Sequence, residues 1–188
     1  MRVISGRAKG FKLKKVPGDT TRPITDRVKE NLFNILGDWV RDTRWLDLFA
    51  GTGQVGIEAL SRGAKSVLFI DSARPAITTI QRNLDHTKLA DSGTLMKLDA
   101  FRYLAQPPSS CFDVIYVAPP QYKDLWEQVL GIVDNDAERW LSETGTVIVQ
   151  IDPKEYKELQ LTLLELVDQR SYGRTMLCFY ELVVSSEI

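Results

Sequence analysis

The stretch LDLFAGTGQVG, residues 46–56, runs from a short apolar segment into a glycine-rich loop. Gly51, Gly53 and Gly56 fit the pattern G-x-G-x-x-G, in which glycines let the chain approach a ligand closely. The pattern alone does not choose the ligand, and a dinucleotide is the first alternative. Asp47 favours another ligand, because a carboxylate just ahead of the loop is poorly matched to a pyrophosphate. It suits ammonium and sulfonium charges, so the stretch predicts S-adenosylmethionine as the cofactor.

Beyond this loop, short apolar runs alternate with amphipathic stretches. The runs are rich in branched and aromatic residues, as in parallel strands buried on both faces, and predict strands at 45–50, 66–71, 94–99, 112–118 and 146–151. The stretches between them predict helices at 55–63, 73–90 and 123–135. The alternation predicts an α/β, doubly wound sheet with right-handed crossovers.

The two ends of the chain depart from this alternation. Apolar residues at helical spacing predict a helix over about 26–40, with Thr25 or Asp26 as its N-cap. Near the C-terminus, LLELVDQRSYGRTMLCFYELVV has two strand-like runs around the turn-prone SYGR. This pattern predicts a C-terminal hairpin and an antiparallel last strand in an otherwise parallel sheet.

Two further acidic residues end predicted strands. Asp71 lies 24 residues after Asp47, where a carboxylate can accept hydrogen bonds from both ribose hydroxyls. Asp99 ends the next strand, where it can accept a hydrogen bond from an adenine amino group, with Ala100 and Phe101 beside the ring. Each acid has an alternative role as a cap for the following helix. Three acids at successive strand ends, together with the glycine loop, favour the cofactor.

Composition predicts a single domain, residues 1–188, with a basic N-terminal arm at about 1–24. The net charge is −1, yet residues 1–30 hold nine Lys or Arg against three acids. Such an asymmetry favours contact with nucleic-acid phosphates, and a solvated, partly flexible terminus is the alternative. Two distant cysteines and no long apolar run predict a cytoplasmic protein without a disulfide, a metal site or a membrane span.

Four segments carry a resemblance to a known family: MRVISGRAKGFKL (1–13), TRPITDRVKENLFNIL (21–36), LDLFAGTGQVGIEALSRGA (46–64) and YGRTMLCFYE (172–181). The chain resembles the bacterial 16S rRNA (guanine-N2) methyltransferases, the RsmD-like group of Rossmann-like, S-adenosylmethionine-dependent enzymes. The resemblance implies a seven-stranded, mostly parallel sheet. It also implies transfer of a methyl group to the exocyclic amine of a guanine in 16S rRNA or the small ribosomal subunit. We expect the protein to act as a monomer and without a membrane.

The resemblance also implies site residues. Those expected around the cofactor are Asp47, Phe49, Ala50, Gly51, Thr52, Gly53, Asp71, Ser72, Asp99 and Ala100. Those expected at the RNA are Arg2, Arg7, Lys9, Lys12, Arg22 and Arg27. For Arg22 and Arg27 the alternative is an ion pair at the helix start, with Asp26 or Glu30. Glu58 and Arg62 are spaced i,i+4 and predict a structural pair, and His86 is interpreted as a surface residue.

The catalytic segment is expected at VAPPQY, residues 117–122, after the fourth strand. Two prolines make a rigid shelf, but the family pattern has Asp or Asn before them, where this chain has Ala118. The expected catalytic residues are Ala118, Pro119, Pro120, Gln121 and Tyr122.

Three readings of this segment stay open. In the first, the Pro119 carbonyl and the Gln121 side chain hold the guanine amine, and Tyr122 stacks on the flipped base. In the second, the protein is a cofactor- and RNA-binding ribosome-assembly factor with weak or no transfer activity. In the third, it methylates a different RNA or DNA base atom.

Overall fold

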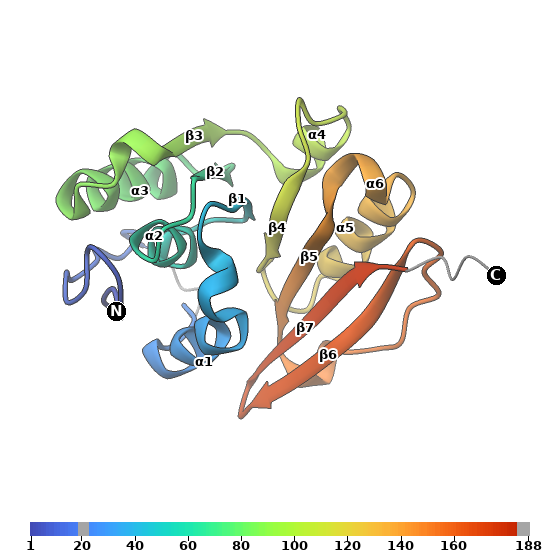
Figure 1. The fold of residues 1–188 in the computed structure, drawn as a ribbon. Coiled ribbons are helices and arrows are strands. Elements are labelled where there is room, and N and C mark those ends of the chain that lie inside the picture. Colours follow the sequence, from blue (N-terminus) through green and yellow to red (C-terminus); the bar gives the residue numbers. More distant parts are fainter. Residues whose placement is uncertain (19–22, 184–188) are drawn as a thin grey trace. The chain divides into compact units, whose positions relative to one another are not determined.

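The computed structural model describes residues 1–18 and 23–183, which form two compact units, Met1–Ala100 and Phe101–Ile188 (Figure 1). Each unit is an α/β arrangement with its own buried strands. The prediction of one domain over the whole chain stays a prediction.

The first unit contains a three-stranded parallel part of the sheet, in the order β3-β2-β1. Its elements are α1 (Asp26–Leu36), a 3-10 turn (Gly37–Val40), β1 (Arg44–Leu48), α2 (Gln54–Ser61), β2 (Ser66–Asp71), α3 (Arg74–Thr87), a second 3-10 turn (Ala90–Ser92) and β3 (Gly93–Lys97). Asp47 of β1 is in register with Phe69 of β2. Because the strands are parallel, β1, β2 and β3 all end at the same edge, which is where Asp47, Asp71 and Asp99 lie in the sequence.

Helix α1 begins where its capping residue allows. Thr25 Oγ1 accepts a hydrogen bond from the Val28 backbone N–H at 3.3 Å, so Thr25, and not Asp26, is the N-cap. The helix buries Leu32 and Phe33 and ends at Gly37, whose φ of 55° is the left-handed conformation that glycine adopts at little cost. The predicted helix to residue 40 is therefore an α-helix to Leu36 followed by a 3-10 turn.

The predicted N-terminal arm is, over residues 1–18, a segment bound to the helices of the first unit. The backbone N–H of Ala8 donates to Ser61 Oγ at 2.9 Å, and that of Lys14 donates to Asn83 Oδ1 at 2.8 Å. Arg2 and Lys12 form an antiparallel bridge, which folds the segment back on itself. These bonds anchor the backbone while leaving most of the basic side chains exposed.

The second unit contains four strands in the order β4-β5-β7-β6. Its elements are α4 (Ala100–Leu104, which begins on the last residue of the first unit), β4 (Phe112–Val117), α5 (Leu125–Asp134), α6 (Ala137–Trp140), β5 (Leu141–Ile151), a 3-10 turn (Pro153–Glu155), β6 (Leu164–Tyr172) and β7 (Thr175–Leu182). β4 and β5 are parallel, whereas β7 is antiparallel to both β5 and β6. Figure 1 shows β6 and β7 as a long hairpin, with Gly173 in its turn at a φ of 62°.

The predicted fold class is confirmed: seven strands, mostly parallel, with an antiparallel last strand and a C-terminal hairpin. The sequence missed α4 and α6, because helices of four or five residues are too short for a periodic apolar pattern. It also began β5 five residues late. Leu141–Ile151 starts with the polar residues Ser142, Glu143 and Thr144, which carry no strand signal.

Candidate cofactor and acceptor sites

The glycine loop turns sharply out of β1 and into α2. Phe49, Gly51 and Gly53 all have positive φ, of 59°, 55° and 72°. A Cβ added to Gly51 would meet only the Phe49 carbonyl oxygen, at 4.0 Å, so its backbone borders open space. A Cβ on Gly53 would lie 3.0 Å from Ile80, and one on Gly56 would lie 2.3 Å from Phe69. Gly51 therefore fits close approach of a ligand, whereas Gly53 and Gly56 let α2 pack on β2 and α3.

Asp47 is a buried carboxylate with little to balance its charge. Its exposed fraction is 2%, and it lies between the fully buried Leu46 and Leu48. Burial raises the pKa of Asp47 well above its usual range; the Gly56 backbone hydrogen bond works against this shift, and the nearby negative charge of Asp71 adds to it. Ionised Asp47 is therefore costly until a cation lies beside it.

Asp71 ties the end of β2 to the glycine loop. Its Oδ2 accepts a hydrogen bond from the Gly51 N–H at 2.9 Å, and its Oδ1 accepts one from the Ala73 N–H at 2.8 Å. The N-cap of α3 is Ala73 and no side chain caps this helix, so Asp71 does not have the capping role proposed as an alternative. Each carboxylate oxygen can accept a second bond, so these two bonds leave capacity for ribose hydroxyls. Ser72, beside it, is exposed.

The remaining residues expected at the cofactor lie on the same part of the first unit. Ala50 donates its backbone N–H to the Ile70 carbonyl at 2.9 Å, which joins the start of the loop to β2. Thr52 is buried, Asp99 is exposed just past the end of β3, and Ala100 is buried at the start of α4. The structure thus joins the loop to the end of β2 through the Gly51–Asp71 and Ala50–Ile70 hydrogen bonds and places Asp99 after the neighbouring strand.

Sequence reasoning missed Asn83, which supports the loop from α3. Its Nδ2 donates to the Thr52 carbonyl at 3.0 Å and to the Lys14 carbonyl at 3.2 Å, and its Oδ1 accepts the Lys14 N–H. Asn83 is fully buried between Ile80 and Leu84 on the apolar face of α3. An amide on an apolar helix face was the available signal, because a buried amide must find hydrogen-bond partners.

Glu58 and Arg62 form the predicted structural pair, with Arg62 Nε 2.8 Å from Glu58 Oε1. A second cation was missed: Lys29 Nζ lies 3.3 Å from Glu58 Oε2, and both side chains are fully buried. Glu58 also accepts the backbone N–H groups of Ile4 and Ser5, at 2.8 and 3.0 Å. Burial lowers the pKa of Lys29, and Glu58 opposes that shift. Lys29 is thus part of the core and not of an RNA-facing basic surface.

The predicted acceptor segment follows β4 in the second unit. Ala118 is half-buried, Pro119 is buried, and Pro120 and Gln121 are exposed. Tyr122 has a φ of 59° and an exposed fraction of 58%. Its ring is accessible even though its backbone adopts an uncommon conformation for a residue with a side chain.

Contacts after β5 hold Tyr122 in this conformation. Its backbone N–H donates to Glu155 Oε1 at 2.6 Å, and its hydroxyl donates to Asp152 Oδ2 at 2.9 Å. Arg174, in the β6–β7 turn, places Nε 3.5 Å from the same Asp152 oxygen. The bond to Asp152 raises the pKa of Tyr122, and the Lys154 backbone N–H lowers the pKa of Asp152. Tyr122 is therefore anchored at both ends with its ring face exposed.

The residues expected at RNA are mostly exposed. Arg2, Arg7, Lys9, Lys12 and Arg27 are all exposed, whereas Arg22 lies outside the described residues. Arg2 also binds Asp26: its backbone N–H donates to Oδ1 at 3.3 Å, and its Nε lies 3.7 Å from Oδ2. Asp26 thus pairs with Arg2 and the chain's amino group, and Arg27 forms no ion pair within residues 1–18 and 23–183.

The one histidine and the two cysteines were the residues considered for a metal site or a disulfide. His86 is exposed and packs edge-on against Phe11, with ring centroids 5.1 Å apart. Cys111 and Cys178 are both free thiols. Within the described part of the chain there is no cluster of potential metal ligands, and no helix there is long and apolar enough to cross a membrane.

Sequence comparison places the chain among known proteins. The model of the family described as "Conserved hypothetical protein 95" matches residues 1–181. The YlbH protein of Bacillus subtilis is 39% identical over 96% of this chain and 98% of its own. The ribosomal RNA small subunit methyltransferase D of Haemophilus influenzae is 31% identical over 92% of this chain and 93% of its own.

Solved structures agree with these relatives. The structure of yhhF from Escherichia coli has a TM-score of 0.81 and 30% identity, and covers 97% of both chains. An RNA methyltransferase from Salinibacter ruber in complex with S-adenosyl-L-homocysteine has a TM-score of 0.63 over 84% of this chain and 92% of its own, at 16% identity that supports the fold alone.

Fold, glycine loop and relatives together define an S-adenosylmethionine-dependent methyltransferase. The residues of the first unit fit this cofactor, because Asp47 has no cationic partner within residues 1–18 and 23–183 and the Gly51 backbone borders open space. The chain belongs to the "Conserved hypothetical protein 95" family, the RsmD-like group that its sequence resembles.

Proposed function

We propose that this protein methylates the exocyclic N2 amine of a guanine in 16S ribosomal RNA, acting as a cytoplasmic monomer on the RNA or on the small ribosomal subunit. The observation that carries the methyl-transfer chemistry is Asp47, a carboxylate with an exposed fraction of 2% that forms no ion pair within residues 1–18 and 23–183. The rRNA substrate is supported by the name of the Haemophilus influenzae relative, which matches over almost the whole chain.

The first unit binds the cofactor in this proposal. S-adenosylmethionine supplies a methyl group on a positively charged sulfur. Asp47 balances the positive charge of the ligand, and Asp71 accepts hydrogen bonds from its ribose. Asp99 accepts a bond from the adenine amino group, and the loop at Gly51 leaves room for the ligand next to the backbone.

The second unit positions the base. An aromatic amine is a weak nucleophile because its lone pair is delocalised into the ring. Two acceptors that take its N–H groups localise the lone pair and orient it. The Pro119 carbonyl supplies one acceptor and the Gln121 carboxamide the other, in place of the side chain that Ala118 lacks. Gln121 is exposed and hydrogen-bonds to no described residue, so its amide is available for this role.

Tyr122 provides a stacking surface for the flipped guanine. Stacking of a base on an aromatic ring contributes about 1–3 kcal/mol. The bonds from Tyr122 to Asp152 and Glu155 reduce the freedom of the ring before the base arrives. Bound S-adenosylmethionine would supply the methyl group to the guanine nitrogen that Pro119 and Gln121 hold, and that nitrogen would release one proton to water.

The experiment is incubation with labelled S-adenosylmethionine and unmethylated 16S rRNA or small subunits, followed by mapping of the label. We expect label on guanine N2. Gln121→Ala is expected to abolish transfer, and Ala118→Asp to preserve or raise it. Full activity of Gln121→Ala would show that Gln121 is not the acceptor, and label on another atom would replace the assigned reaction.

A second function is favoured by one observation, the alanine at position 118. Loss of a positioned hydrogen-bonding group can lower a rate by about 10²–10³. The protein would then be an assembly factor that binds cofactor and RNA without efficient transfer. Cofactor binding by calorimetry together with no incorporation, in both wild type and Ala118→Asp, is the result that selects this function.

A further inference from the structure

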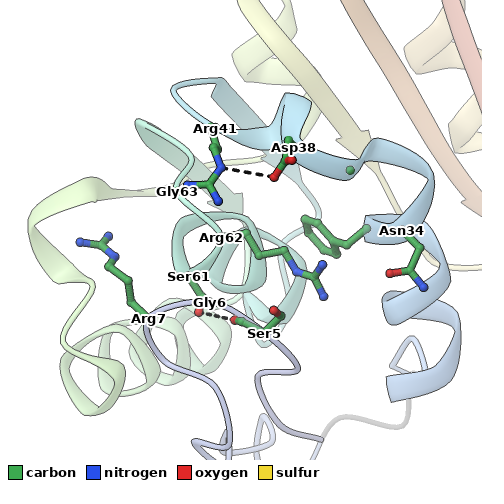
Figure 2. Close-up of a pocket in the computed structure, with 11 residues that line it drawn as sticks. Ser5, Gly6, Arg7, Asn34, Asp38, Arg41, Ser61, Arg62 and Gly63 are labelled. Carbon is green, nitrogen blue, oxygen red and sulfur yellow. Dashed lines mark hydrogen bonds and ion pairs between the residues drawn. The ribbon is translucent and has the colours of Figure 1, made fainter.

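A pocket of about 720 Å³ lies at the end of α2 that is remote from the glycine loop (Figure 2). The glycine loop precedes Gln54 at one end of this eight-residue helix, and Ser61, Arg62 and Gly63 line the pocket at the other. Eight residues of α-helix span about 12 Å. The pocket is thus separate from Asp47 and the cofactor residues, and the proposed methyl transfer does not use it.

Three arginines and a single acid line this pocket. The arginines are Arg7 from the N-terminal segment, Arg41 from the turn before β1 and Arg62 after α2, and the acid is Asp38. In the view of Figure 2, Arg41 lies at the top, above Arg7 at the left and Arg62 in the centre. The lining therefore has an excess of positive charge on a protein whose net charge is −1.

Arg62 is held in one orientation by its neighbours. Its Nε binds Glu58 Oε1 at 2.8 Å, and its guanidinium carbon lies 4.8 Å from the centre of the Phe33 ring. Only 17% of its side chain is exposed. Because Lys29 also pairs with Glu58, the charge of Glu58 does not cancel that of Arg62. The terminal nitrogens of Arg62 have no hydrogen bond within the described residues, so a preorganised guanidinium group remains available.

The side chains of the other two arginines make only weak interactions with the rest of the protein. Arg41 Nε lies 3.4 Å from Asp38 Oδ1, but the two side chains are 69% and 94% exposed, and exposed pairs of this kind are readily exchanged. Arg7 is exposed, and its Nη2 reaches the Leu60 carbonyl only at 3.4 Å. Its backbone is nevertheless fixed, because the Arg7 N–H donates to the Ser61 carbonyl at 2.8 Å.

We propose that this pocket binds phosphodiester groups of the ribosomal RNA, at a distance from the cofactor. Guanidinium groups match phosphate oxygens through paired hydrogen bonds, and a fixed guanidinium loses little freedom on binding. An RNA large enough to be a ribosomal substrate extends well beyond one base, so contacts at the far end of α2 hold its backbone. The inference rests on the proposed RNA substrate and adds Arg41 and Arg62 to the expected contacts.

The test is the affinity of the full-length protein for a 16S rRNA fragment, measured by filter binding across a range of salt concentrations. The double variant Arg7→Ala/Arg41→Ala is expected to bind about 10-fold or more weakly at low salt. Its plot of log affinity against log salt should be less steep by about 1.4 to 1.8, because each of the two lost phosphate contacts removes roughly 0.7 to 0.9. Arg62→Lys keeps the charge near Glu58 but loses the planar fork, so it should weaken binding by a smaller factor without lowering the melting temperature.

Matched controls separate this site from general charge effects. Arg82→Ala removes an exposed arginine from α3 and is expected to change neither affinity nor slope, while Asp38→Asn should tighten binding. RNA affinity and slope in the double variant equal to those of Arg82→Ala would overturn the inference. A second result would also overturn it: inorganic phosphate stabilises the wild type but not the double variant, and the RNA affinity of the double variant is unchanged. The pocket would then be a site for free anions.

The measurement does not depend on methyl transfer. Pocket-dependent RNA binding without label on guanine N2 would refute the proposed reaction and leave the pocket assignment standing. If label appears on guanine N2 but the double variant binds RNA as tightly as the wild type, the proposed reaction stands and the pocket assignment is refuted.

Discussion

Two buried carboxylates of the first unit, Asp47 on β1 and Glu58 on α2, have opposite surroundings. Glu58 binds Lys29, Arg62 and two backbone N–H groups. Asp47, just before the loop that leads into α2, has one backbone hydrogen bond and a second acid nearby. Removing one partner from a paired buried charge is strongly destabilising, and a buried charge that has no partner costs stability until a ligand supplies one. The comparison separates a structural carboxylate from a ligand-binding one on physical grounds.

The largest effect is expected from Glu58→Ala. The substitution leaves Lys29 buried without its carboxylate partner, with only the Arg2 carbonyl at 2.6 Å as acceptor. It also removes the acceptor of the Ile4 and Ser5 N–H groups, so the free energy of unfolding should fall by about 3–5 kcal/mol. Chemical denaturation measures it, with Glu30→Ala, an exposed acid on α1, as the control. If the free energy of unfolding falls by less than about 1 kcal/mol, Glu58 does not have the structural role assigned to it.

Asp47→Asn should act on the ligand instead of the fold. The substitution removes the buried negative charge and keeps the shape, so affinity for S-adenosylmethionine should fall by about 10²-fold, as expected for one lost charged partner. Calorimetry measures this affinity. The free energy of unfolding at neutral pH should stay level or rise. Asp91→Asn, which changes an exposed acid, is the control. If Asp47→Asn binds S-adenosylmethionine as tightly as this control, Asp47 is not a ligand-binding carboxylate.

Two glycines of the loop can be divided in the same way, into one that supports the fold and one that supports cofactor binding. Gly56→Ala puts a methyl group 2.3 Å from the Phe69 ring, so it should cost about 1–3 kcal/mol of stability through overpacking. Gly51→Ala meets no such contact, and its φ of 55° costs only about 1–2 kcal/mol in αL. Its main effect should be weaker cofactor binding. Thermal melts and calorimetry of both variants decide between these outcomes, and equal effects on both properties would contradict the division.

The smallest effect is a difference in pH dependence between wild type and Asp47→Asn. Because the pKa of Asp47 is raised in the folded state, the folded protein keeps this proton at pH values where the unfolded chain has lost it. The contribution of Asp47 to stability is therefore present below its unfolded pKa of about 3.9 and is lost as the pH rises toward the folded value. The slope from one proton is at most about 1.4 kcal/mol per pH unit.

Denaturation at a series of pH values tests this expectation. Subtracting the Asp47→Asn curve from the wild-type curve isolates the contribution of Asp47, because the other acids are common to both. The difference should favour Asp47→Asn increasingly as the pH rises above about 4. A difference that does not change with pH would mean that Asp47 is ionised at no cost.

Local patterns in the sequence were enough for the main elements of the fold and for the cofactor half of the site. Short apolar runs located all seven strands, because a strand's pattern is contained in the strand itself. Asp47, Asp71 and Asp99 could be assigned to one edge because parallel strands end together. The i,i+4 spacing of Glu58 and Arg62 was sufficient for the same reason, since both residues belong to one helix.

The remaining features join residues that are far apart along the chain. Lys29 meets Glu58 from another helix, Tyr122 is held from beyond β5, and the N-terminal segment is bound by α2 and α3. No local pattern contains such pairs, because they form only when packing brings separate elements together.

The sequence by itself thus determined the seven strands, the longer helices α1, α2, α3 and α5, the glycine loop and the acids at the strand ends. Only the tertiary structure decided which of two buried carboxylates is paired, because that depends on cations supplied by distant elements. Lys29 reaches Glu58, and the described residues bring no cation to Asp47. The cost of an unpaired buried charge is what makes that difference a guide to ligand binding.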